Sequence, residues 1–286
     1  MPSMSPPRAL EPFLDLLRCP MCRAGLRLSR GSLRCSLGHT FDISRHGYAS
    51  LLAGTRATSG DDAAMVLARD RFLSTGRYEP IREAVAHLAA GPAVAADRAG
   101  TVVDSGCGTG YYLAGVLDRL PGARGLGLDT SVRALRLAAR AHQRATVAAW
   151  DVFRPLPLAD GAVDLLLDVF APRNPSEFRR VLHPSGRLVV VRPTDRHLAE
   201  LYDRMSVMVT VDPAKEQRLH RALAPFFTAT DTKQVEYTTP VNGVEAVDLV
   251  GMTPSARHLD RVDRDLQASL PDRVTVSVLA TAYRPR

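Results

Sequence analysis

The stretch from Thr101 to Tyr112, TVVDSGCGTGYY, constrains the fold of this chain more than any other. A β-branched run ends at Asp104, three alternating glycines follow at Gly106, Gly108 and Gly110, and a helix-compatible segment comes next. This order of strand, glycine-rich turn and helix is typical of the first unit of a doubly wound α/β domain. The glycines let the backbone turn sharply and approach a ligand where a Cβ atom would clash.

The spacing of these glycines separates two kinds of nucleotide-binding loop. A dinucleotide fingerprint has G-x-G-x-x-G, but here the third glycine comes one position early and Tyr111 stands in its place. The pattern D-x-G-C-G-T-G instead resembles motif I of the class I S-adenosylmethionine (SAM) methyltransferases. The resemblance implies that the loop packs under the methionine end of SAM and that Asp104 helps to hold its ammonium group. A glycine-rich turn of some other α/β protein is the alternative.

The rest of the chain continues the alternation that this fold requires. Strands are predicted at Arg124–Asp129, Ala145–Trp150, Val163–Val169, Arg187–Arg192, Lys233–Thr239 and Val274–Tyr283. Helices are predicted within residues 61–73, 78–90, 176–182, 197–209 and 244–251. We therefore expect an α/β fold, a Rossmann-like class I SAM-methyltransferase domain with a seven-stranded sheet.

Two further acids follow predicted strands. Asp129 comes 25 positions after Asp104, near the spacing at which a carboxylate meets ribose hydroxyls. Its alternative role is to cap the helix that begins near Ser131. Similarity to SAM enzymes implies that Asp151 accepts from the adenine amino group while Val152 covers the ring. The predicted cofactor-binding residues are Asp104, Gly106, Gly108, Gly110, Tyr111, Asp129, Asp151 and Val152.

The N-terminal region contains a metal-ligand pattern. Cys19, Cys22, Cys35 and His39 form a C-x2-C-x12-C-x3-H array with a predicted hairpin turn at Arg30–Ser32 between its halves. Four such ligands suit tetrahedral zinc and leave no open position, so a structural Zn²⁺ in a small zinc-ribbon domain is predicted. A disulfide is the competing interpretation, but the odd number of cysteines in the array, three of the chain's four, and the expected cytoplasmic location argue against it. His46 lies close in sequence, although His39 fits the spacing better.

The net charge of +7 is unevenly distributed. Residues 1–50 contain seven arginines against Glu11, Asp15 and Asp42, a surplus of four, whereas residues 51–100 are balanced. A basic N-terminal region predicts a polyanionic partner. The alternative is that the region is basic only because this chain uses arginine throughout, since Lys215 and Lys233 are its only lysines.

The order of these features resembles the RlmA family of 23S rRNA methyltransferases. The matching segments are Gly38–Asp42, Gly47-Tyr48, Gly60-Asp61 and Met65–Arg69, followed by motif I. The stretch Val169–Arg180, VFAPRNPSEFRR, is similar to the tylosin-resistance branch of that family. The resemblance covers essentially the whole chain. It implies methylation of guanine N1 in a 23S rRNA hairpin loop, protection of the ribosome against macrolides, and a homodimer that builds an RNA cleft.

Guanine N1 carries a proton at neutral pH, so this reaction is expected to need a base or a contact that stabilises the deprotonated ring. The contact belongs at the carboxyl end of the fourth predicted strand. There Asp168 is predicted to accept the proton, Arg173 to stabilise negative charge on O6, and Asn174 to read the guanine edge. The alternative is that Asp168 faces outward and Asn174 caps the next helix.

RNA contacts are predicted in the zinc ribbon. Alternate positions of a hairpin place side chains on one face, and the predicted RNA-binding residues are Arg23, Arg27, Arg30 and Arg34. Residues 1–50 are expected to form the zinc-binding domain, 51–100 a helical connecting region and 101–286 the methyltransferase domain. No run of about 18 apolar residues and no secretory signal is found, so a cytoplasmic location is expected.

Two functions of other classes remain open at this point. One is a SAM-dependent methyltransferase acting on a small-molecule natural-product intermediate, with the zinc ribbon as a dimer contact. The other is a non-catalytic RNA-binding protein that keeps the SAM fold. Whether turnover depends on RNA distinguishes a small-molecule enzyme from an rRNA enzyme. Titration with SAM distinguishes a non-catalytic RNA-binding protein from a SAM-dependent enzyme.

Overall fold

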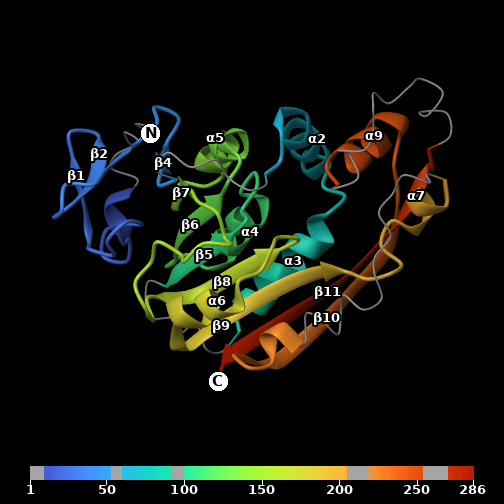
Figure 1. Ribbon diagram of the computed structural model, residues 1–286. Helices are drawn as coiled ribbons and strands as arrows, with labels where there is room; N and C mark the ends of the chain where they lie inside the picture. The colour runs from blue at the N-terminus through green and yellow to red at the C-terminus, as the bar shows by residue number, and fades with distance from the viewer. Residues whose placement is uncertain (1–9, 53–59, 92–99, 205–217, 219–220, 254–269) are drawn as a thin grey trace.

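A computed structural model describes residues 10–52, 60–91, 100–204, 218, 221–253 and 270–286. An eight-stranded sheet runs through the molecule in the order β10-β11-β9-β8-β5-β6-β7-β4 (Figure 1). Its strands are β4 (Tyr48–Ser50), β5 (Thr101–Ser105), β6 (Arg124–Asp129), β7 (Ala145–Ala149), β8 (Val163–Val169), β9 (Leu182–Pro193), β10 (Phe227–Pro240) and β11 (Arg273–Pro285). All neighbours pair in parallel except around β11, which is antiparallel to both β9 and β10.

A second sheet of three antiparallel strands lies beside one end of the large sheet and forms the zinc ribbon (Figure 1). It consists of β1 (Leu26–Ser29), β2 (Ser32–Cys35) and β3 (Thr40–Asp42). The helices are α2 (Ala63–Ser74), α3 (Glu79–Ala89), α4 (Tyr111–Arg119), α5 (Val132–Ala141), α6 (Pro175–Val181), α7 (Ala199–Arg204) and α9 (Gly243–Gly251), and a 3₁₀ turn, η1, covers Glu11–Phe13.

Alternating side chains of the central strands face two different hydrophobic cores. Val102 packs with Ile81 of α3 and Leu113 of α4 on one face of the sheet. Its neighbour Val103 points to the other face, where Phe178 of α6 and the N-terminal residues 10–51 complete the core. A strand with both faces covered favours apolar residues at successive positions, which explains the run Leu165–Leu167 in β8.

The predicted seven-stranded sheet is confirmed, and β4 adds an eighth strand from the N-terminal region. Tyr48 pairs with Val147, Ala49 with Ala148 and Ser50 with Ala149 of β7. Ala49 is fully buried. A three-residue strand is too short to show an alternating hydrophobic pattern in the sequence. It is recognisable only in the structure, where it pairs with the edge of β7. The ribbon region is thereby tied to the methyltransferase sheet by backbone hydrogen bonds.

Several predicted boundaries move in the structure. The last two strands are longer than expected because β10 and β11 pair along almost their whole length. The strand predicted at Arg187–Arg192 begins earlier, at Leu182, and its pairing with β8 shifts register between Val163 and Leu165. Residues 53–59 and 92–99 of the predicted connecting region, and the end of the helix predicted within residues 197–209, lie outside the described residues. Within the described part, no helix is long and apolar enough to cross a membrane.

Candidate cofactor site and zinc centre

The loop after β5 turns tightly beneath the neighbouring strand. The backbone N–H groups of Gly106 and Cys107 both donate to the carbonyl of Leu128 on β6, at 2.8 and 3.0 Å. Gly106 has φ +84°, and a Cβ atom there would lie 2.5 Å from the Cβ of Ala171. Gly110 begins α4 in the same left-handed conformation. The loop therefore requires glycine both for its backbone angles and for the close approach of the β8–α6 segment.

Four acids gather at the carboxyl ends of β5 to β8, as the sequence predicts. Asp104 is fully buried, and neither of its carboxylate oxygens has a hydrogen-bond partner among the described residues. Burial, and after it the charges of Asp129 and Asp168, raise the pKa of Asp104 to about 8. A buried carboxylate without a donor is costly unless a ligand supplies the missing partner. This site is therefore complementary to a cationic group.

Asp129 joins the loop to the next helix. Its Oδ2 accepts the N–H of Gly108 at 2.8 Å, and its Oδ1 accepts the N–H of Ser131 at 2.8 Å. Burial raises the pKa of Asp129, while these two N–H groups act in the opposite direction. Ser131, not Asp129, is the N-cap of α5, so the capping alternative is wrong for Asp129. Each oxygen keeps a second lone pair, which suits a vicinal diol.

Asp151 and Asn174 make hydrogen bonds to the segment that follows β7. Asp151 is buried, and its Oδ1 accepts the N–H of Phe153 at 3.0 Å. The side-chain amide of Asn174 donates to the carbonyl of Val152 at 3.0 Å. Asn174 occupies the N-cap position of α6 but makes no side-chain hydrogen bond to the helix backbone. Its amide therefore joins the segment after β8 to the segment after β7.

The buried Asp168 and the partly exposed Arg173 form an ion pair at the end of β8. The Asp168 carboxylate is fully buried, so the alternative in which it faces outward is wrong. Nε of Arg173 lies 3.0 Å from its Oδ1, but the two groups are not aligned for a hydrogen bond. Burial raises the pKa of Asp168 to about 7, against the opposing effect of Arg173. A carboxyl group with a pKa near neutrality can both accept and release a proton at physiological pH.

The two tyrosines after the glycine loop pack edge-on against each other, with ring centroids 5.1 Å apart, and each has a further partner of its own. The hydroxyl of Tyr111 donates to Glu79 on α3 at 2.9 Å, and Arg82 lies over its ring. Contact of Tyr111 with the cofactor thus stays a prediction. Tyr112 lies edge-on to Phe170, with ring centroids 6.3 Å apart.

Phe170 is a site residue that the sequence analysis missed. It follows Asp168-Val169 at the carboxyl edge and has φ +54°, a conformation that is rare for a bulky side chain. Its ring stacks on buried His197 with an interplanar angle of 20°. Burial lowers the pKa of His197 to about 4, so this support is a neutral imidazole. No local pattern marks such a residue, because its strain arises from contacts distant in sequence.

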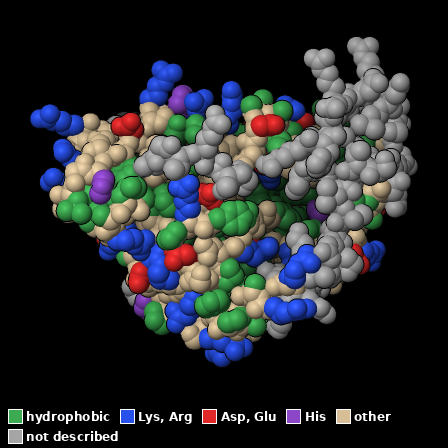
Figure 2. Space-filling view, in the orientation of Figure 1, with side chains coloured by type: hydrophobic (Ala, Val, Ile, Leu, Met, Phe, Trp, Pro, Cys, Tyr) green, Lys and Arg blue, Asp and Glu red, His purple; other side chains and the backbone are tan. Residues whose placement is uncertain are grey.

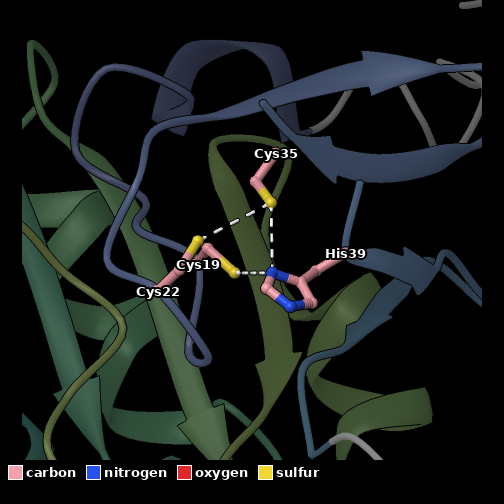
Figure 3. Close-up of side chains that lie close together, drawn as sticks. All are labelled: Cys19, Cys22, Cys35 and His39. Atoms are coloured by element: carbon pink, nitrogen blue, oxygen red, sulfur yellow. Dashed lines mark hydrogen bonds between the residues drawn. The ribbon is translucent and has the colours of Figure 1, made fainter. Parts of the chain in front are cut away.

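The four predicted metal ligands meet at one point (Figure 3). Sγ of Cys22 and Sγ of Cys35 are 3.7 Å apart, and Nδ1 of His39 lies 3.3 Å from Cys35 Sγ and 3.6 Å from Cys19 Sγ. Zn–S bonds of about 2.3 Å in a tetrahedron separate two sulfurs by about 3.8 Å. All four atoms lie within 4.8 Å of one another, and the cysteines are free. The cluster has the size of a zinc tetrahedron, and the disulfide alternative is wrong.

The ribbon arginines divide into two groups. Arg27 and Arg34 are exposed and directly opposite each other on β1 and β2, and Arg30 lies in the exposed two-residue turn between these strands. The guanidinium of Arg23 instead donates to the carbonyls of Leu156 and Leu158, at 2.7 and 2.8 Å. Arg23 therefore connects the ribbon to the methyltransferase domain, and its contact with RNA stays a prediction.

Comparison with known proteins identifies the family to which both parts of the chain belong. The zinc ribbon of the RlmA N-terminal domain matches residues 17–57, and a methyltransferase domain matches residues 102–186. The chain is 45% identical to the 23S rRNA (guanine(748)-N(1))-methyltransferase of Streptomyces fradiae, over 94% of this chain and 96% of the relative. It is also 45% identical to a Micromonospora griseorubida protein named for guanine-N1 methylation of 23S rRNA, over 96% of this chain and 98% of that one. The chain belongs to the RlmA family.

As a member of the RlmA family, the protein is a SAM-dependent methyltransferase with a structural zinc ion. The donor sets described above fit both groups. Three thiols and one imidazole fill a zinc tetrahedron, which leaves no open position for catalysis. The unpartnered carboxylate of Asp104 suits the ammonium of SAM, because a cation there offsets the mutual repulsion of the buried acids.

Proposed function

We propose that this protein transfers a methyl group from SAM to N1 of one guanine in a hairpin loop of 23S rRNA. The observation that carries the proposal is the ion pair between buried Asp168 and partly exposed Arg173, beside the predicted cofactor acids. It supplies a proton acceptor and a cation at the edge of the sheet where substrates of doubly wound folds bind.

The cofactor is held, in this proposal, by the acids of three neighbouring strands. Asp104 binds its ammonium, Asp129 its ribose hydroxyls and Asp151 its adenine amino group, with Val152 against the ring and Gly106, Gly108 and Gly110 beneath it. SAM supplies an electrophilic methyl group on a sulfonium. The main contribution of the protein is orientation of that methyl group in line with N1 of the base.

The base chemistry falls to residues after β8. Asp168 accepts the N1 proton, which its pKa near 7 permits at neutral pH. Arg173 stabilises the negative charge that then develops on O6, and Asn174 contacts the guanine edge. The guanine must leave its stack to reach these groups.

RNA is bound, we propose, by the exposed hairpin arginines Arg27, Arg30 and Arg34. A second copy of the chain completes the RNA cleft. The methylated guanine lies beside the macrolide site of the ribosome, and the methyl group blocks its base-pairing edge. The ribosomes of an antibiotic-producing cell are thereby protected against macrolides of the tylosin type.

The decisive experiment is transfer of labelled methyl from SAM to unmodified 23S rRNA, followed by reverse transcription. Methylation at N1 blocks base pairing, so a single stop in one large-subunit hairpin is expected. Asp168→Asn should lower the transfer rate by about 100-fold or more while SAM still binds. Tight SAM binding without transfer to RNA would contradict the proposal and favour a small-molecule substrate.

A further inference from the structure

An arginine-rich surface lies outside both sites described above. It consists of Arg133, Arg136 and Arg140 on α5 and Arg45 on the β3–β4 turn, and we call it the α5 arginine face. The three helix positions are spaced i, i+3 and i+7, so they share one side of the helix. The opposite side of α5 is buried through Ala134, Leu135 and Ala138. All four arginines are exposed.

The turn and the helix form one continuous surface. A Cβ atom on Gly47 would lie 3.3 Å from the Cβ of Ala139, so the β3–β4 turn packs directly on α5. Burial, and after it the charges of Arg136, Arg45 and Arg140, lower the pKa of His46 in that turn. Blue side chains lie at the upper left of the space-filling view, over the ribbon and α5, and others are spread over the rest of this face (Figure 2).

Within the described part of the chain, no ion pair neutralises this surface. Residues 130–150 contain no Asp or Glu. Among the described residues, none of the four arginines makes an ion pair, whereas arginines elsewhere are paired, such as Arg69 with Asp61 and Arg71 with Asp248. Grouping like charges without counter-charges destabilises a protein unless an external anion offsets the repulsion.

We propose that the α5 arginine face binds the phosphate backbone of the RNA substrate. The helical part spans seven residues, about 10 Å, over which a nucleic-acid strand presents roughly three phosphates. The face begins just after Asp129 at the cofactor edge and reaches the ribbon. The arginines contact the phosphate backbone of the RNA, so this binding does not depend on RNA sequence. The loop of the RNA hairpin then reaches the carboxyl ends of the strands. The inference rests on the proposed rRNA methylation.

The test compares two double variants with the same charge loss. Arg136→Gln/Arg140→Gln removes two charges from the face. Arg119→Gln/Arg273→Gln removes two exposed arginines that have no ion pair within the described part of the chain. The probe is unmodified 23S rRNA, with affinity measured over a range of salt concentrations.

The α5 variant should bind RNA about tenfold more weakly, with a salt slope smaller by about 1.5, because each phosphate contact contributes roughly 0.7–0.9. KM for RNA should rise while kcat at saturating RNA and SAM affinity stay unchanged. The control variant should change affinity by less than about twofold. Adding Arg45→Gln to the α5 variant should lower the slope again by about 0.8.

An α5 variant with wild-type affinity and salt slope overturns the proposal. A triple variant with the same slope as the double variant overturns the claim that ribbon and helix form one surface. If the wild-type protein does not methylate rRNA at all, the proposed function itself has failed. If the wild type methylates rRNA and the α5 variant equals it, only the RNA surface has failed.

Discussion

At the scale of single residues, the buried acids combine a proposed ligand role with a cost to the stability of the fold. Asp104 is recognisable in the sequence by its place before the glycine loop. In the structure its carboxylate is buried without a donor among the described residues. This burial, together with the charges of Asp129 and Asp168, raises its pKa. In the cofactor-free protein its folded pKa of about 8 lies above that of an unfolded chain. The stability that it contributes is therefore present at low pH and is lost as the pH rises from about 4 to about 8.

Replacing Asp104 with asparagine should remove this pH dependence. We expect Asp104→Asn without SAM to melt on the order of 5 °C higher than wild type at pH 8, with little difference near pH 5. SAM affinity should fall, because the ammonium loses its partner. Melting curves from pH 5 to 9 measure the first effect and titration with SAM the second. Asp231→Asn, at an exposed position of β10, is the control and should follow wild type. Parallel curves for wild type and Asp104→Asn would refute the protonation of Asp104.

At the scale of elements, α2 connects the glycine loop to the C-terminal helix α9. Arg69 of α2 binds Asp61 and the carbonyl of Met252, and its Cδ lies beside Gly108 of the loop. Arg71 makes two hydrogen bonds to the buried carboxylate of Asp248 in α9, at 2.9 and 2.5 Å. The periodicity predicted both helices. Their pairing required the tertiary structure, because residues 71 and 248 are distant in sequence.

Breaking this pair should destabilise the protein. Arg71→Gln leaves the Asp248 carboxylate buried with a weaker partner, which should cost about 1–3 kcal/mol of unfolding free energy in denaturant titrations. The matched change Arg196→Gln affects a more exposed pair with Glu236 and should cost less than about 1 kcal/mol. In the double variant Arg71→Gln/Asp248→Asn, the loss should be smaller than the sum of the two single losses. Equal losses for Arg71→Gln and Arg196→Gln would argue against a special role for the α2–α9 pair.

At the scale of the whole molecule, the zinc ribbon shares a hydrophobic core with the methyltransferase sheet. Residues 10–51 pack with Val103, Leu166 and Leu188. The backbone of residues 16–18 also pairs with residues 157–159, through Arg18 to Pro157 and Ala159 to Leu16. Two segments predicted as separate domains are thereby held in one orientation, which places ribbon arginines at a set distance from the cofactor site.

Arg23 is the side chain that most directly tests this rigid attachment. Arg23→Ala should retain zinc and SAM binding but allow faster amide exchange at residues 156–159, since the carbonyls of Leu156 and Leu158 lose the Arg23 donor and keep that of Arg180. The kcat/KM for rRNA should fall by about tenfold as the orientation relaxes. Arg27→Ala, at an exposed hairpin position, should lower RNA affinity without changing that exchange. Unchanged exchange in Arg23→Ala would show that its hydrogen bonds do not hold the ribbon in place.

The sequence by itself determined the features that depend on local spacing. The cysteine and histidine positions define the zinc ligands because knuckle geometry is local. The order of strands, turns and acids defines the class I fold because acids that end parallel strands meet at one edge of a sheet. Asp168 was identified in the same way.

Only the tertiary structure decided the features that depend on distant contacts. Pairing with β7 makes a strand of Tyr48–Ser50, and Phe170, at a positive φ, packs against Tyr112 and His197. Arg23 and Arg27 have the same chemistry, yet the position of the methyltransferase domain gives one a partner and leaves the other exposed. Protonation of Asp104 likewise follows from its burial, because side chains from many segments of the chain exclude water from it. Such properties are set by packing between residues far apart in the chain, and no local pattern encodes them.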